Sequence, residues 1–259
     1  MTPDEPIPGG RAEDGRPLDP KTPDHGVGRL VRDVEHFEQR VLPGWLRPSD
    51  PENRVPVMIA IVAAIGMQSA IPAKYGLHPR WFIPGLEAVL LVALTALNPV
   101  RMTRSTTLGK YASLALVAAI TIDNGFSAGF LDYDILTSKA SGDASGLLAS
   151  GAAIYLTNIV AFGIWYWELD RGGPFARRDA RNPYPDFLFP QMANPTLAPP
   201  HWTPRFLDYL YVSFTNVLAF SPTDTMPLSR WAKTLMAAQS AVAVSTTALV
   251  IARAVNVLK

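Results

Sequence analysis

The chain has 259 residues, of which 48% are hydrophobic and 17% are charged, and its formal net charge is +1. A net charge near zero gives no reason to expect nucleic acid as a partner, and the absence of cysteine excludes disulfides, thiolate metal sites and cysteine nucleophiles. The apolar residues are gathered into runs with the charges between them, which is typical of a membrane protein with a polar tail.

The N-terminal region divides into two parts. Residues 1–25 are rich in Pro, Gly, Asp and Arg, carry no signal-peptide pattern, and are expected to be disordered because they hold too little apolar surface to offset their chain entropy. Within residues 26–54, apolar residues recur at helical spacing between Val27 and Val41. This pattern predicts a cytoplasmic amphipathic helix, lying either on the membrane surface or against the body of the protein, followed by a linker.

The rest of the chain predicts an all-α, polytopic membrane helix bundle with about six hydrophobic segments. Residues 55–169 hold four predicted transmembrane helices, each close to the ~20 residues that cross a bilayer. Residues 170–205 are a polar, Pro-rich connector that is expected to lie over the protein, and residues 206–259 form a C-terminal helical hairpin. The six expected segments are Val55–Pro72, Trp81–Val100, Thr107–Leu131, Leu147–Leu169, Phe206–Phe220 and Trp231–Leu258.

Positive charge predicts the orientation, because cytoplasmic loops carry an excess of Lys and Arg. The N-terminal region, the loop after the second segment and the connector are the Arg-rich parts, whereas the opposite loops hold few basic residues. This bias predicts a multi-pass protein of the cell membrane with six crossings and both termini in the cytoplasm.

Polar residues at membrane depth are functional candidates because burying them in lipid costs free energy. The same residues could instead be hydrogen-bonding contacts that hold helices together. Glu87 and Glu168 lie near the ends of their segments, within reach of the interface. The candidates expected to face a shared interior are Asp123, Asn158, Asp208, Asn216, Gln239 and Thr246.

The sequence contains no recognisable catalytic motif. The four histidines are scattered without metal-ligand spacing, and neither a phosphate-binding glycine loop nor a nucleophile elbow is present. We therefore expect no catalytic residues, no metal and no cofactor.

The C-terminal stretch carries two resemblances. Asp208-Tyr209-Leu210-Tyr211, Ser213-Phe214-Thr215 and Asp224 resemble a family of uncharacterised bacterial multispanning membrane proteins, a domain of unknown function, which implies an inner-membrane protein. The same stretch looks like the pore helix, filter and inner helix of potassium channels, with Ser213-Phe214, Asp224 and Pro227 in place. Ala219 to Thr223 lack the filter glycines whose backbone carbonyls line the ion path in such channels.

These observations favour a channel-like or transporter-like protein for a cation or proton. Asp123 and Asp208 would attract the ion, and the amide and hydroxyl groups would replace its hydration shell. The alternative is a non-transporting scaffold or accessory subunit. For both functions, the expected partners are the lipid bilayer and either a second copy of the chain or another membrane protein.

Overall fold

The computed structural model describes residues 43–77, 79, 81–97, 106–137, 144–218 and 224–257. The expected disordered tail (1–25), the expected amphipathic helix and the positions matched to the channel filter (219–223) lie outside the described residues. The chain from Pro43 onward forms one compact unit, and the description below concerns this unit alone.

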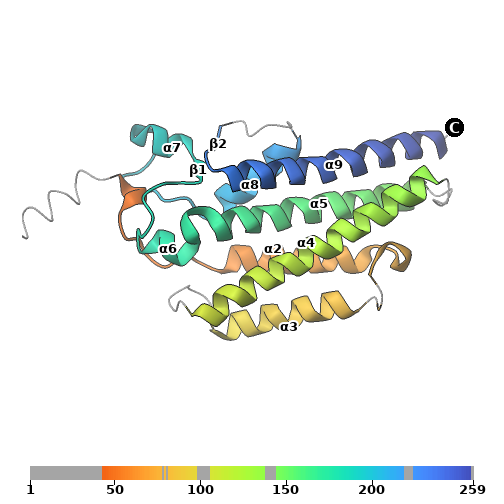
Figure 1. Cartoon of the computed structure of the whole chain (residues 1–259), viewed down its shortest axis with the longest axis horizontal. Coiled ribbons are helices and arrows are strands. Elements are labelled where there is room, and N and C mark those ends of the chain that lie inside the picture. The colour runs from red at the N-terminus through yellow and green to blue at the C-terminus, as the bar shows by residue number, and fades with distance from the viewer. Residues whose placement is uncertain are drawn as a thin grey trace, which may run out of the picture. The chain divides into compact units, whose positions relative to one another are not determined.

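The described residues form an all-helical bundle with one short two-stranded sheet (Figure 1). Its main helices begin and end close to the expected apolar runs. Thr106 starts one of them, because its hydroxyl accepts a hydrogen bond from the Gly109 amide at 3.0 Å. The elements are η1 (Gly44–Leu46), α2 (Val55–Ala70), η2 (Ala73–Tyr75), α3 (Phe82–Leu97), α4 (Thr107–Leu136), α5 (Ala144–Leu169), η3 (Asp170–Gly172), α6 (Pro174–Arg178), β1 (Phe187–Leu188), α7 (Pro190–Ala193), η4 (Pro195–Leu197), α8 (Phe206–Leu218), β2 (Met226–Pro227) and α9 (Arg230–Val257).

Three helices are long and apolar enough to cross a membrane, in the part of the chain that the structure describes: Thr107–Leu136, Ala144–Gly172 and Arg230–Asn256. Helices α2 and α3 are apolar but shorter, with 16 residues each. Large apolar side chains point outward from α2, α3 and α4, such as Ile59 (64% exposed), Val92 (68%) and Ile122 (53%). An apolar exterior of this kind is typical of a surface that faces lipid or another protein.

The bundle has two ends, which we call the connector end and the far end. The connector end carries α6, α7 and the β1–β2 sheet, and the far end holds the start of α5 and the C-terminal part of α9 (Figure 1). α8 begins at the connector end, where the Phe206 amide donates to Glu52 at 2.7 Å. After α8 the chain is back at that end, because β2 pairs with β1 and the Leu228 amide donates to the Asp186 carbonyl at 2.8 Å.

The start of α8 and strand β2 therefore lie at the same end of the bundle, and α9 runs from there to the far end. Whether Phe206–Phe220 crosses a membrane stays a prediction. With 13 residues, α8 is about 20 Å long, which is too short to reach from one end of α9 to the other.

The connector is tied down by a buried polar cluster, which we call the connector clamp: Asp170, Arg177, Asp186 and Tyr209. The Asp170 carboxylate accepts hydrogen bonds from the Tyr209 hydroxyl at 2.6 Å and from the Asp186 and Phe187 amides at 2.8 and 3.3 Å. Arg177 Nη1 donates to the carbonyls of Trp167 and Asp170 at 2.5 and 2.9 Å. These hydrogen bonds hold the start of the connector against α5 and α8.

Helices α5 and α8 meet at Gly163. A Cβ placed there would lie 3.0 Å from Leu210 Cδ1 and 3.1 Å from its Cα, whereas a Cβ at Gly129 of α4 would meet nothing within 4 Å. Gly163→Ala is therefore expected to destabilise the protein by about 1–3 kcal/mol, because overpacking forces the two backbones apart. Gly129→Ala is the matched control and should be neutral or stabilising, by up to about 1 kcal/mol. Thermal unfolding of the two variants in detergent checks this; equal midpoints would contradict the close approach.

Candidate functional site

The six residues expected to face a shared interior lie in different surroundings. Asn216 and Gln239 meet in one network, Asp123 belongs to a separate acidic cluster, and Asp208 lies at the start of α8. Asn158 and Thr246 are buried, and their side-chain polar atoms have no hydrogen-bond partner among the described residues.

Gln239 is the centre of a hydrogen-bond network between α5, α8 and α9. Its Oε1 accepts from the Tyr166 hydroxyl at 2.5 Å and from Asn216 Nδ2 at 2.9 Å, and its Nε2 donates to Ser213 Oγ at 2.6 Å. Ser213 in turn donates to the Ile159 carbonyl at 2.7 Å, and Asn216 donates to the Met236 carbonyl at 3.1 Å. Because these groups satisfy one another, the network holds three helices together and leaves few free ligands for an ion.

Asp208 has a local role. Its Oδ2 accepts a hydrogen bond from the Arg205 amide at 2.7 Å, and it is an acidic residue in the first turn of α8. A carboxylate in this position stabilises a helix N-terminus by accepting from its free amides and by opposing the helix dipole. Asp208 is half-buried and lies at the connector end, away from Asp123 near the far end.

The acidic cluster consists of Glu87 of α3, Asp123 of α4 and Gln68 of α2. All three are buried, at 0%, 6% and 6% exposure. The two carboxylates are close enough for their charges to interact, and neither forms an ion pair with a described residue. Gln68 Nε2 donates to Asp123 Oδ2 at 3.1 Å and to the Ile120 carbonyl at 3.2 Å.

Within this cluster Asp123 has hydrogen-bond donors, whereas Glu87 has none among the described residues. Asp123 accepts from Gln68 and from the backbone of Leu77. Both oxygens of Glu87 lack a hydrogen-bond donor among the described residues, and so does Gln68 Oε1. The orientation of the Gln68 amide is fixed by its bond to the Ile120 carbonyl, since only its nitrogen can donate. The cluster therefore has three buried acceptor atoms and too few hydrogens to satisfy them.

The sequence leaves Glu87 outside the six residues expected to face a shared interior, because its place near the end of an apolar run puts it within reach of the interface. A sequence signal was nevertheless present: Glu87, Leu91 and Leu94 are spaced by four and three residues, so they share one face of a helix. Leu91 and Leu94 are buried on that face, at 9% and 3% exposure. A carboxylate on the core face of an apolar helix is a functional candidate wherever it lies along the run.

One small cavity adjoins the acidic cluster, and a larger cavity lies about one helical turn away from it. The smaller, about 20 Å³, lies toward the far end and is lined by Gln68, Asp123 and Ser127 together with residues of the turn before α3. Its volume admits about one water molecule. It gives Asp123 a polar contact on that side of the bundle.

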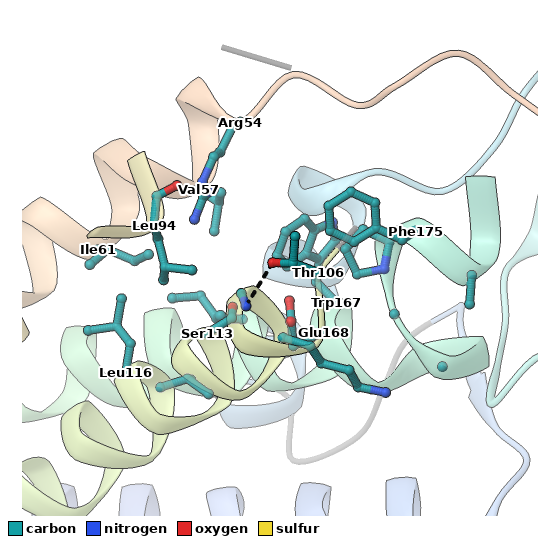
Figure 2. Close-up of a pocket in the computed structure, with 18 of the residues that line it drawn as sticks. Arg54, Val57, Ile61, Leu94, Thr106, Ser113, Leu116, Trp167, Glu168 and Phe175 are labelled. Carbon is teal, nitrogen blue, oxygen red and sulfur yellow. Dashed lines mark hydrogen bonds between the residues drawn. The ribbon is translucent and has the colours of Figure 1, made fainter. Parts of the chain in front are cut away.

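The larger cavity, about 130 Å³, opens at the connector end between α2, α3, α4, α5 and α6 (Figure 2). Arg54 and Glu168 line its mouth, with Lys110 and Ser113 of α4 nearby. Arg54 Nη1 donates to the Leu94 carbonyl at 2.8 Å, and the Glu168 carboxylate is within reach of the Ser113 hydroxyl and within electrostatic range of Arg54, Lys110 and Arg177. Deeper in, the walls are apolar: Val57, Ile61, Leu116, Val117, Ile120 and Ile164.

Arg181 also lines the larger cavity, but its charge is already matched. It pairs with Asp179 Oδ2 at 2.7 Å, and Arg178 pairs with Asp179 Oδ1 at 2.7 Å. The hydrogen bond from Arg178, assisted by Arg181, holds the pKa of Asp179 below its usual range. The charged groups left at the mouth are thus Arg54, Lys110 and Glu168.

Comparisons of the chain with known protein families, with curated proteins and with solved structures gave no match. Among the described residues, no group of His, Asp and Glu side chains is arranged to hold a metal ion. The features that point to a function are the acidic cluster, the small cavity beside it and the larger cavity at the connector end.

Proposed function

We propose that the chain is an integral membrane protein with a transporter-like or channel-like role, and that Glu87 and Asp123 form its binding site for a proton or cation. One observation carries the proposal: two carboxylates are buried side by side in an apolar bundle without an ion-pair partner among the described residues. Such a pair costs free energy, so its presence inside a membrane helix bundle favours a role in moving charge.

Membrane insertion is supported by the three long apolar helices and by the outward-facing apolar side chains. Arginines concentrate at the connector end, which favours the cytoplasmic side for that end. Because α9 runs from the connector end to the far end, we propose that the last helix ends outside the cytoplasm. The alternative is the arrangement with six crossings and both termini in the cytoplasm.

The channel-like form of the proposal is supported by the course of segment 206–229. A short helix α8 that begins at the same end as β2, followed by the long helix α9, is also the order of elements expected from the resemblance to a potassium-channel pore unit. Pore units of that kind assemble from several copies around one path, so in this form the protein is a homo-oligomer in the cell membrane.

The non-transporting scaffold is the second candidate, and the Gln239 network favours it. Tyr166, Ser213, Asn216 and Gln239 satisfy one another and need no ion. The acidic cluster is the feature that this alternative leaves unexplained, because helix packing needs no unpaired carboxylates.

Ion flux into liposomes tests the proposal. Purified protein is reconstituted, a potential is applied, and internal pH and cation content are followed with dyes. We expect vesicles with the wild-type protein to show a higher ion flux than protein-free vesicles. Asp123→Asn and Glu87→Gln should each lower the flux rate at least roughly tenfold, since each removes an ionisable group from the path.

Asp134→Asn is the matched control for these variants. Asp134 lies on the same helix as Asp123 but pairs at the surface with Lys74 at 3.7 Å, so its variant should keep the wild-type rate. Wild-type flux no higher than that of empty vesicles, for every ion, would exclude transport and leave the scaffold.

A further inference from the structure

One residue, Ile120, contacts both the larger cavity and the acidic cluster. Ile120 forms part of the cavity wall, and its carbonyl accepts from Gln68 Nε2. The same nitrogen donates to Asp123, one helical turn along α4. The inner end of the cavity and the acidic cluster are therefore separated by about one turn of helix.

The walls of the cavity change from charged to apolar along this direction. Glu168, 8% exposed, is at the mouth with Arg54 and Lys110 around it. The inner end is closed by Ile61, Val117 and Ile120, which are 5%, 1% and 0% exposed. An apolar constriction of this kind blocks ions while it is dry and conducts once water fills it.

The acidic cluster lacks hydrogen-bond donors, and this lack favours one kind of bound species over another. Gln68 Oε1 and both oxygens of Glu87 are buried acceptors without donors, and Gln68 lies beside Glu87. A hydrogen on the Glu87 carboxyl would supply the donor that Gln68 Oε1 lacks and would remove one of two adjacent negative charges. A metal cation would instead need several more oxygen ligands than these side chains offer.

We propose that the species handled by the acidic cluster is a proton, and that the cavity of Figure 2 is its entrance from the connector end, closed by Ile61, Val117 and Ile120. This inference rests on the proposed function and adds the species and the route. A proton is taken up at Glu168, passes along water that enters the constriction, and is accepted by the Asp123 carboxylate. A proton leaves from Glu87 or Asp123 to the small cavity, so that one proton enters for each that leaves.

Thiol labelling tests the route without requiring transport. Because the chain has no cysteine, each variant carries one reactive thiol. Ser113→Cys places it in the cavity wall, and Tyr184→Cys places it on the connector surface, where Tyr184 is 85% exposed. In sealed vesicles, a small charged thiol reagent should label both variants from the same side. Ser113→Cys that reacts from the opposite side, or from neither, would overturn the entrance.

A second experiment tests the constriction and the species. Ile120→Ser should let water into the constriction and raise proton flux severalfold, with K⁺ and Na⁺ flux unchanged. Ile122→Ser makes the same change on the same helix at a side chain that faces outward, 53% exposed, and should leave the rate unaltered. Val117→Thr, which keeps the side-chain shape, repeats the test if Ile120→Ser does not fold.

The outcomes separate the two proposals. A wild type that conducts K⁺ or Na⁺ as fast as protons overturns the proton assignment but keeps transport. Equal rates for Ile120→Ser and Ile122→Ser, with Val117→Thr also unchanged, overturn the constriction. A wild type without flux of any ion overturns the proposed function, whereas the labelling pattern still decides whether the cavity opens at the connector end.

Discussion

Asp170→Ala is expected to destabilise the protein by about 3–5 kcal/mol, because it removes one partner from a buried network of charged groups. Asp170 is 0% exposed and accepts hydrogen bonds from Tyr209 and from two amides of the connector. Its loss leaves these donors unpaired and removes one of the negative charges near the buried Arg177. The free energy of unfolding in detergent, measured with denaturant, checks the size of the effect.

Asp179→Ala is the control for this prediction. Asp179 also belongs to the connector and also pairs with two arginines, but Arg181 is largely exposed and the pair is screened by solvent. Exposed ion pairs contribute about 0–1 kcal/mol, so this variant should resemble the wild type. A loss of similar size for the two aspartates would mean that the connector clamp does not anchor the connector.

Gln239→Leu is expected to destabilise the protein by about 2 kcal/mol. It removes four hydrogen bonds at roughly 0.6 kcal/mol each and leaves the buried Tyr166 hydroxyl without an acceptor. Tyr166→Phe removes one of these bonds and should cost about 0.6–1 kcal/mol by the same reasoning. Unfolding of the two single variants and of the double variant measures the coupling between them.

Thr234→Val serves as the control on the same helix. Thr234 is exposed and its hydroxyl donates within its own turn, to the Arg230 carbonyl at 3.0 Å, so its replacement should change stability little. If the two residues are independent, the double variant will show the sum of the single losses, and the network described for Gln239 would then be wrong.

The helices could be predicted from the sequence because apolar runs and their boundaries are local signals. α2 begins at Val55 as expected and ends at Ala70, before Pro72, and α5 ends at Leu169 as expected. The end of the bundle at which the chain lies after α8 could not be predicted in the same way. Whether a short apolar helix crosses or returns depends on where the next segment is anchored, and that anchor is the pairing of β2 with β1, about forty residues upstream.

The candidate site was predicted in part. The seven-residue spacing of Gln239 and Thr246 indicates one helix face, and both side chains are buried, at 0% and 1% exposure. Asp123 lies in the acidic cluster, but the sequence did not indicate that Glu87 would be beside it. Contacts between different helices depend on how the helices pack, and a single sequence carries no direct signal of that packing.

The shortness of α2 and α3 has a consequence for the surrounding lipid. Sixteen residues of helix span about 24 Å, less than the ~30 Å hydrocarbon layer of a typical bilayer. If the chain is the membrane protein proposed above, lipid next to these two helices would thin locally to match them. Glu87 belongs to α3 and its neighbour Gln68 to α2, so under the proposed function the thickness of the host membrane would set how far the Glu87 carboxylate lies from bulk water.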